Sequence, residues 1–187
     1  MDIVFPKNNE NDFIELAEKL GYNSLCLVYK LKSFKNSYDS KIKLTFGVLA
    51  EPNEVRKAKK LSEFVFVKSS DKDRAVMENN KNLFLFGLEK AARHDFIHHR
   101  AGLNQVLCKI AYKNKIKICI PFSDVLNSED VERANILGRM LQNIRICRKY
   151  KVEVFVGSFA SEPFDMRTVH DLTAFGKVLG MNTPFLL

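Results

Sequence analysis

The chain has no tryptophan, no long apolar run and no pair of cysteines at short spacing. A membrane-spanning helix needs about 20 consecutive apolar residues, and no stretch of this sequence approaches that length. The first residues, MDIVFPKNNEND, lack the basic start and the apolar centre of a secretion signal. We therefore expect a cytoplasmic protein.

The four cysteines, Cys26, Cys108, Cys119 and Cys147, stand singly along the chain. Zinc ribbons and thiol redox sites need two cysteines close in sequence, and compact disulfide-bonded domains need a denser pattern. We therefore expect four buried, reduced thiols.

Several catalytic motifs are also missing. There is no glycine-rich dinucleotide fingerprint, no phosphate-binding P-loop and no G-x-S-x-G around a serine. A metal-dependent phosphoesterase on a barrel is expected to carry a His-x-His pair after its first strand, but this chain has FPKNN. Three of the four histidines, His94, His98 and His99, fall in one loop, and no second ligand cluster is visible. The sequence predicts no catalytic residue and no protein-bound metal or cofactor.

What the chain does have is a large apolar content and an excess of positive charge. Its 187 residues are 46% hydrophobic and include 15 phenylalanines, enough to build the core of one domain, 1–187. Thirty Lys and Arg against 22 Asp and Glu give a net charge of +8. Such an excess favours a polyanionic partner, most simply a nucleic acid.

Short apolar segments alternate with amphipathic ones along the chain. Asp12 and Asp71 are predicted to cap two of the helices, Pro52 to begin one that runs to Leu61, and the longest to start near Ser128. The predicted strands are 2–5, 25–29, 42–49, 64–67, 83–86, 116–121 and 152–156.

Strands that alternate with helices pair in parallel, with the helices packed outside the sheet. An open doubly wound sheet and a closed barrel both satisfy this rule. Because no dinucleotide fingerprint is present, we favour an α/β fold of the small, TIM-like (PHP-like) barrel type, with about seven parallel strands and outer helices.

The basic residues fall into two groups. Many lie near predicted helix C-termini, where positive charge offsets the helix dipole. Others lie in or just after loops that leave the carboxyl ends of strands, where barrels place their sites. We predict that this second group contacts nucleic-acid phosphates, with salt bridges of Arg100 and Arg167 to Asp95 or Asp165 as the alternative. Its members are Arg74, Arg93, Arg100 and Arg167, with Lys68, Lys72, Lys90, His98 and His99 on the same face.

The start of the helix after Gly102 is a second candidate for phosphate binding. Backbone amides at a helix start attract anions, and Arg100 lies just before them. Asn104 and Gln105 could reach a sugar or phosphate, or could simply be exposed amides. The aromatic residues Phe155, Phe159, Phe164 and Phe175 are expected to pack in the core and loops, because no aromatic-ribbed RNA-binding strand is present.

Three stretches resemble the ribonuclease P component 3 family, the thirty-kilodalton-type protein subunit of archaeal and eukaryotic ribonuclease P. They are RHDFIHHRAGLNQVLCKIAYKNKIKICIPFSDVL, ERANILGRMLQNIRICRKYKVEVFVGS and FDMRTVHDLTAFGKVLGM, and DRAVMEN at 73–79 adds to the likeness. The resemblance implies a TIM-like barrel that binds RNA without catalysing, while the RNA, with Mg²⁺, removes the 5′ leader of precursor tRNA. The implied partners are ribonuclease P RNA, precursor tRNA, the ferredoxin-like component 2 and other protein subunits.

Two other functions remain open at this stage. One is a small barrel enzyme, such as a metal-dependent phosphoesterase, with its site at the same loops. The other is a protein-interaction scaffold whose charge serves solubility.

Overall fold

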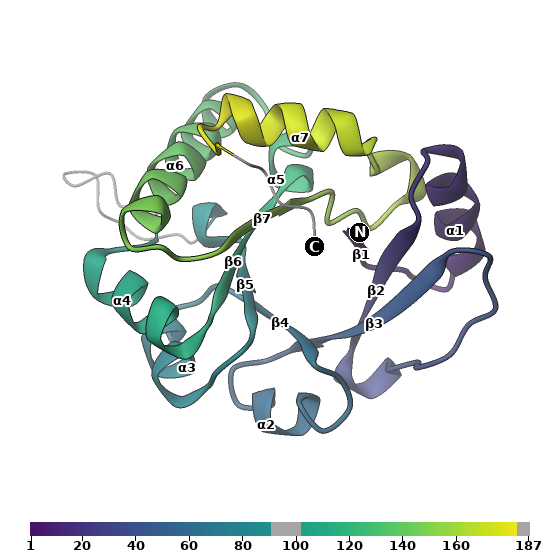
Figure 1. Ribbon diagram of the computed structural model, residues 1–187, viewed down its shortest axis with the longest axis horizontal. Coiled ribbons are helices and arrows are strands. Elements are labelled where there is room, and N and C mark those ends of the chain that lie inside the picture. Colours follow the sequence, from purple (N-terminus) through teal and green to yellow (C-terminus); the bar gives the residue numbers. More distant parts are fainter. Residues whose placement is uncertain (91–101, 183–187) are drawn as a thin grey trace.

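The strands form one parallel sheet in sequence order, β1 to β7, in a computed structural model that describes residues 1–90 and 102–182 (Figure 1). Their number and parallel pairing are as the apolar pattern predicts, with ends that differ by one or two residues. The strands are β1 (Asp2–Val4), β2 (Ser24–Lys30), β3 (Lys43–Ala50), β4 (Phe64–Lys68), β5 (Phe84–Phe86), β6 (Lys117–Pro121) and β7 (Val154–Gly157).

The sheet curls until its two edges meet, which makes a nearly closed barrel rather than an open sheet. Val4 forms one parallel bridge with Ala160, just beyond β7, and the N–H of Phe5 donates to the Ala160 carbonyl at 2.8 Å. The carboxylate of Asp2 accepts the N–H of Ser158 at 2.7 Å. A side chain therefore supplies part of the bonding that a strand ladder supplies elsewhere, and the predicted small barrel is confirmed.

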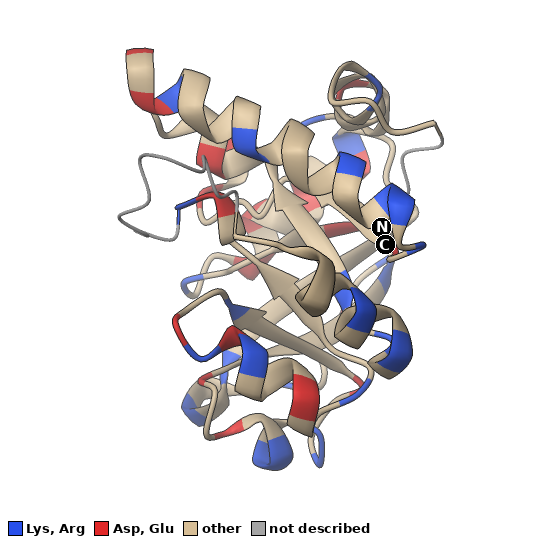
Figure 2. Ribbon diagram, turned by 90° about the vertical axis from the view of Figure 1, so that its left-hand side faces the viewer, with Lys and Arg blue, Asp and Glu red and all other residues tan. Residues whose placement is uncertain are grey.

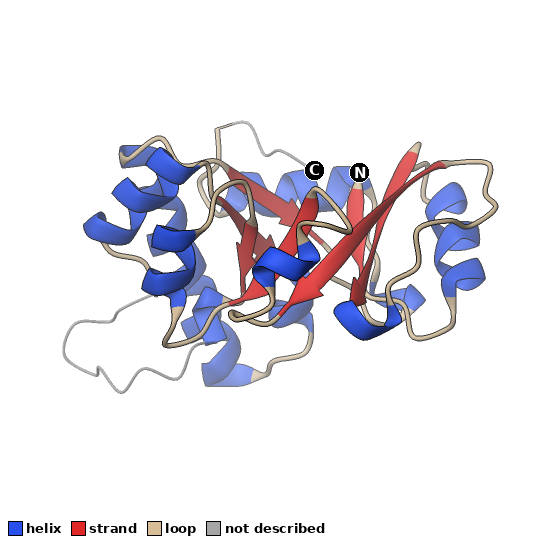
Figure 3. Cartoon of the chain, turned by 90° about the horizontal axis from the view of Figure 1, so that it is seen from below, coloured by secondary structure: helices blue, strands red, loops and turns tan. Residues whose placement is uncertain are grey.

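The helices surround the barrel, as Figures 1 and 3 show from two directions. Three short 3₁₀ helices lie in the loops: η1 (Leu31–Ser33), η2 (Leu88–Lys90) and η3 (Pro163–Asp165). The α-helices are α1 (Glu10–Lys19), α2 (Val55–Ala58), α3 (Asp73–Asn79), α4 (Gln105–Asn114), α5 (Phe122–Leu126), α6 (Asp130–Lys149) and α7 (Val169–Val178).

Several helix boundaries differ from the sequence predictions. Asp12 lies in the first turn of α1, which begins after Asn9, so it is not the cap. Asp71 does not cap α3, because the N-cap position is Lys72 and has no side-chain cap bond; Asp73, in the first turn, instead fixes the preceding loop by accepting from the Ser69 hydroxyl at 2.6 Å and the Ser70 N–H at 2.8 Å. The helix predicted to run to Leu61 ends at Ala58, and α5 was missed because five residues are too few to show a helical period.

Phenylalanine fills the barrel interior. In β2, Leu25 and Leu27 pack outward against α1 while Cys26 and Val28 point inward, as strand geometry requires. The rings of Phe66 and Phe84 stack inside with centroids 4.8 Å apart. The outer layer of the core lies between the strands and α2, α3, α4, α6 and α7. All four cysteines are free and buried in these layers, as predicted.

Gly47 of β3 makes room for one of these rings. A Cβ at this position would lie 2.8 Å from Cε2 of Phe66 and 3.2 Å from the carbonyl oxygen of Phe64. The first distance is too short for a Cβ contact and the second is tight, so the absence of a side chain lets Phe66 occupy the centre of the barrel.

Candidate nucleic-acid interface

Two of the predicted lysines meet at the carboxyl ends of the strands. Lys68 is the last residue of β4, and Lys90 ends η2, just after β5. Lys90 Nζ lies 3.2 Å from Oδ1 of Asp124, which α5 places directly after β6. Burial raises the pKa of Asp124, while the charges of Lys90 and Lys68 oppose that rise. The partly buried carboxylate therefore holds Lys90 in place, and Lys68 lies near enough for its charge to act on the same group.

Arg167 lies near the same end of the barrel, between η3 and α7. Its Nη1 donates to the carbonyls of Phe164 at 3.0 Å and Met166 at 2.8 Å, and its guanidinium lies over the Phe122 ring, 5.4 Å from the centroid. Within residues 1–90 and 102–182 it pairs with no carboxylate, so the predicted alternative of a salt bridge to Asp165 is wrong. Its charge remains available to an anion.

Two further predicted contacts belong to α3. Arg74 is the second residue of α3, just after the loop that leaves β4, as the sequence predicts, and its Nε binds Oε1 of Glu78 at 2.9 Å on the solvent side. This i,i+4 ion pair supports the helix, and contact of Arg74 with RNA stays a prediction. Lys72 precedes α3 and is exposed.

Four of the predicted contacts, Arg93, His98, His99 and Arg100, lie outside the described residues, as does Asp95. Their role in RNA binding stays a prediction.

The start of α4 is occupied by its own cap. The side chain of Asn104 accepts hydrogen bonds from the N–H groups of Val106 at 3.0 Å and Leu107 at 2.9 Å. These are the amides that the phosphate prediction relied on, so that prediction is wrong for them, and Asn104 serves the helix instead. The amide oxygen of Gln105 accepts from the Tyr150 hydroxyl at 3.4 Å.

Gly102 is explained by packing. Its φ is +97°, and a Cβ there would lie 2.9 Å from the carbonyl oxygen of Leu88 in η2. Only glycine fits this contact. The structure therefore shows Gly102 as a residue of close approach to a neighbouring backbone.

A buried carboxylate supports η2 from behind. Glu89 is fully buried, its Oε1 accepts from Nδ2 of Asn143 at 2.7 Å, and its carbonyl accepts from Nη1 of Arg139 at 2.7 Å. Burial raises the pKa of Glu89 to about 7. These contacts from α6 anchor the residue next to Lys90. Sequence reasoning missed Glu89, because a glutamate beside a lysine ordinarily indicates a solvated surface.

The phenylalanine predictions are confirmed with one exception. Phe155 and Phe159 pack inside the barrel, and Phe175 contacts Phe122 with centroids 5.1 Å apart. Phe164 does not pack: 87% of its side chain is exposed on η3. The interpretation of Phe164 as a packing residue is therefore wrong.

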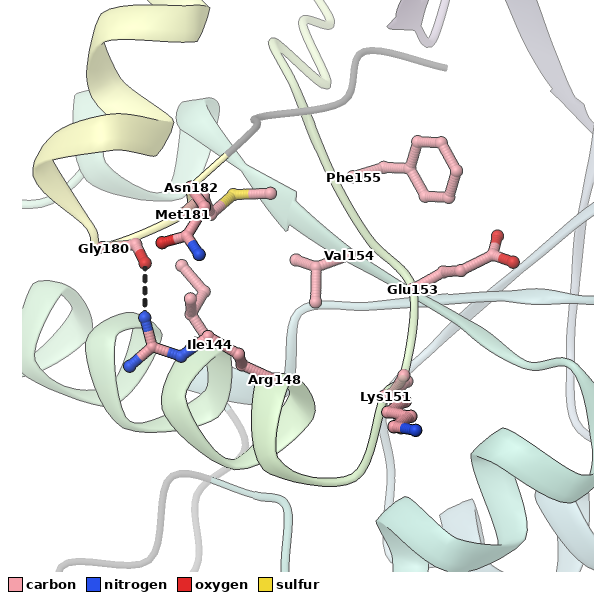
Figure 4. Close-up of a pocket in the computed structure, with 10 residues that line it drawn as sticks. Ile144, Arg148, Lys151, Glu153, Val154, Phe155, Gly180, Met181 and Asn182 are labelled. Carbon is pink, nitrogen blue, oxygen red and sulfur yellow. Dashed lines mark hydrogen bonds between the residues drawn. The ribbon is translucent and has the colours of Figure 1, made fainter.

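A cavity of about 550 Å³ lies at the other end of the barrel, where β7 begins and α6 ends (Figure 4). Its walls include Ile144, Val154 and Met181, and at its edge Nη1 of Arg148 donates to the Gly180 carbonyl at 3.4 Å. The cavity is mainly apolar and lies at the opposite end of the strands from Lys68 and Lys90. The cavity is therefore separate from the surface that carries Lys68 and Lys90.

Charge along α6 follows the helix dipole, as Figure 2 shows for the long helix of that view. Asp130 and Glu132 occupy its first turn, and Arg148 and Lys149 its last.

Among the described residues, no group of three or more His, Cys, Asp and Glu side chains is placed to hold a metal ion. No described helix is both long and apolar enough to cross a membrane.

Comparison with known proteins relates the chain to ribonuclease P. Residues 93–184 match the family model described as RNase P subunit p30. Ribonuclease P protein component 3 of Methanosarcina barkeri is 28% identical over 192 residues, which cover 94% of this chain and 76% of that protein. The protein of the same name from Methanothermobacter thermautotrophicus is 24% identical over 187 residues, and the match covers 89% of this chain and 74% of that protein.

Among solved structures, a chain in the cryo-EM structure of archaeal ribonuclease P with mature tRNA superposes with a TM-score of 0.75 at 19% identity. The superposition covers 95% of this chain and 82% of that one. The structural match confirms the fold, and the sequence matches confirm the resemblance that the three C-terminal stretches predict.

Proposed function

We propose that this relative of Ribonuclease P protein component 3 is an RNA-binding protein subunit of ribonuclease P that leaves catalysis to the RNA. The match of residues 93–184 to the RNase P subunit p30 family carries the proposal. Its ligands are ribonuclease P RNA and precursor tRNA, from which the assembly removes the 5′ leader. The ferredoxin-like component 2 is the proposed protein partner, and Mg²⁺ is proposed to act at the RNA.

The chemistry required of the polypeptide is positioning and charge neutralisation. Lys90, held by Asp124, and Lys68, whose charge acts on the same carboxylate, supply point charges for phosphate oxygens at the carboxyl ends of the strands. Arg167 adds a permanently charged planar group that can grip two phosphate oxygens at once. Contacts of this kind fix the register of an RNA on the protein surface without changing any covalent bond.

Reconstitution tests the proposal directly. The full chain, component 2 and ribonuclease P RNA are mixed, and precursor tRNA cleavage is measured at limiting magnesium. We expect faster cleavage than with the RNA alone or with the RNA and component 2. If adding the chain changes nothing, the proposal fails. Stoichiometric bound metal together with hydrolysis that needs no RNA would instead identify a barrel enzyme.

The residues are tested by salt-dependent binding. Each phosphate contact steepens the fall of log affinity with log salt concentration by about one unit. Lys68→Ala and Lys90→Ala should each weaken RNA binding and reduce that slope by about one. Lys113→Ala, at the exposed end of α4, is the matched control and should change neither. Binding that is insensitive to salt would contradict a phosphate interface.

A further inference from the structure

Phe164 is displayed to solvent on a loop that is tied down on both sides. Its carbonyl accepts a 3.0 Å hydrogen bond from Arg167, and Pro163 restricts the backbone just before it. Glu162 forms a 2.9 Å ion pair with Lys7, which follows β1. Val169, at the start of α7, is a second apolar side chain with 40% exposure. A fixed loop that holds a large apolar ring in water is typical of a contact surface.

The surroundings of this ring carry the opposite charge to the rest of the protein. Segments 7–20 and 158–171, which pack together where α1 meets η3, hold seven acidic and three basic residues, a net charge of −4. The remaining residues therefore carry +12. We call these two segments the acidic edge.

The two lysines of the acidic edge are already paired with carboxylates of the same edge. Lys7 pairs with Glu162, and Lys19 pairs with Glu15 at 2.6 Å. The guanidinium of Arg167 bonds two backbone carbonyls. By contrast, Asp12 and Asp165 form no ion pair within the described part of the chain. Arg167 is the one cation of the acidic edge with no carboxylate partner among the described residues, and the net charge of the edge remains negative.

We propose that Phe164 and the acidic edge dock a lysine- and arginine-rich protein that offers an apolar recess for the ring. The inference rests on the proposed function, because the partner it implies is another protein subunit of the ribonuclease P particle. A buried aromatic anchor inside a ring of complementary charge is the arrangement that gives a protein interface its affinity and its orientation.

RNA is the less suitable occupant of this surface. Proteins that stack unpaired bases on aromatic rings set those rings in a positively charged groove that follows the phosphates. The net negative charge of the acidic edge, which Arg167 only partly offsets, would repel those phosphates, whereas Lys90 and Lys68 lie near Asp124, outside this edge.

The test uses the full chain and the other ribonuclease P protein subunits of the same organism, each purified and titrated singly by calorimetry. Phe164→Ser should weaken binding to one subunit by about tenfold or more, because it removes the anchor. Asp165→Lys should weaken the binding of the same subunit and reduce the salt dependence of that binding. Val131→Ser, which changes a 73% exposed residue of α6, is the matched control and should leave all affinities unchanged.

Binding of each variant to ribonuclease P RNA is measured in parallel. If no subunit binds the wild-type chain, or if Phe164→Ser leaves every subunit affinity unchanged, the docking site is refuted. A variant that loses RNA affinity alone also refutes it and makes Phe164 a stacking platform. If the wild-type chain binds a subunit through Phe164 but neither binds RNA nor stimulates cleavage, the docking site stands and the proposed function fails.

Discussion

The carboxylate of Asp2 accepts a hydrogen bond from the backbone N–H of Ser158 at 2.7 Å, across 156 positions of sequence. The same oxygen accepts from the N–H of Ile3 at 2.8 Å, and the Ser158 hydroxyl donates to the Ile3 carbonyl at 3.3 Å. The first strand is thereby joined to the segment after the last one. Because the barrel edges share a single backbone bridge among the described residues, the closure depends on this pair.

Removal of the Asp2 carboxylate should therefore weaken the seam, the junction between β1 and the segment after β7. Asp2→Ala leaves two buried N–H donors unpaired, and we expect the free energy of unfolding to fall by about 2–4 kcal/mol. Asp2→Asn keeps an acceptor oxygen and should cost less. Urea unfolding of the three proteins measures the difference. Equal stability of Asp2→Ala and wild type would show that the seam closes without the side chain.

Glu89 should make stability depend on pH. Burial raises its pKa to about 7 in the folded protein, from 4.5 in the unfolded chain. The folded state therefore binds the Glu89 proton more tightly than the unfolded chain does. The stability that this protonation contributes is complete below pH 4.5 and is lost as the pH rises through 7. Asp2, whose pKa burial raises to about 6, acts in the same direction.

Glu89→Gln isolates that contribution, since the amide oxygen can still accept from Asn143. The variant should gain stability relative to wild type between pH 5 and pH 8, by about 3 kcal/mol at most. Urea titrations at the two pH values measure it, and Glu63→Gln on the exposed surface is the control. If the stability difference between wild type and Glu89→Gln is the same at both pH values, Glu89 does not titrate as described.

Two glycine substitutions should have opposite effects. Gly47→Ala places a methyl group 2.8 Å from the Phe66 ring, and overpacking of this kind costs about 1–3 kcal/mol. Gly138→Ala in α6 meets nothing within 4 Å and should stabilise by about 0.5–1 kcal/mol through helix propensity. Thermal unfolding of the two variants compares them. If Gly47→Ala is as stable as the wild type, the Phe66 ring can adopt another position without loss of packing.

Asn104 should behave as a helix cap. Asn104→Ala is expected to lower the free energy of unfolding by about 1 kcal/mol, while Asn104→Asp retains the acceptor and most of the stability. RNA affinity should remain at the wild-type level in Asn104→Asp. Weaker RNA binding at unchanged stability would restore the sugar or phosphate contact that the sequence also allows.

Local pattern was enough for the strands, for the helices other than α5 and for the kind of fold. Alternating apolar runs such as those of β2 and β3 locate strands, and the helical spacing of Leu172, Phe175 and Leu179 locates the last helix. The candidate site was harder to predict. Lys68 and Lys90 follow strand ends in the sequence itself, whereas the convergence of both on Asp124 depends on three separate strand-to-helix loops.

The order of residues by itself determined seven parallel strands, an apolar interior rich in phenylalanine, and the resemblance to ribonuclease P, because these follow from neighbours close in the chain. Tertiary structure decided how the barrel closes through Asp2 and Ser158, that Glu89 is buried, that Asn104 serves its helix, and that Phe164 faces water. Each of these depends on which distant segment lies opposite a side chain, and burial and hydrogen bonding are set by that partner.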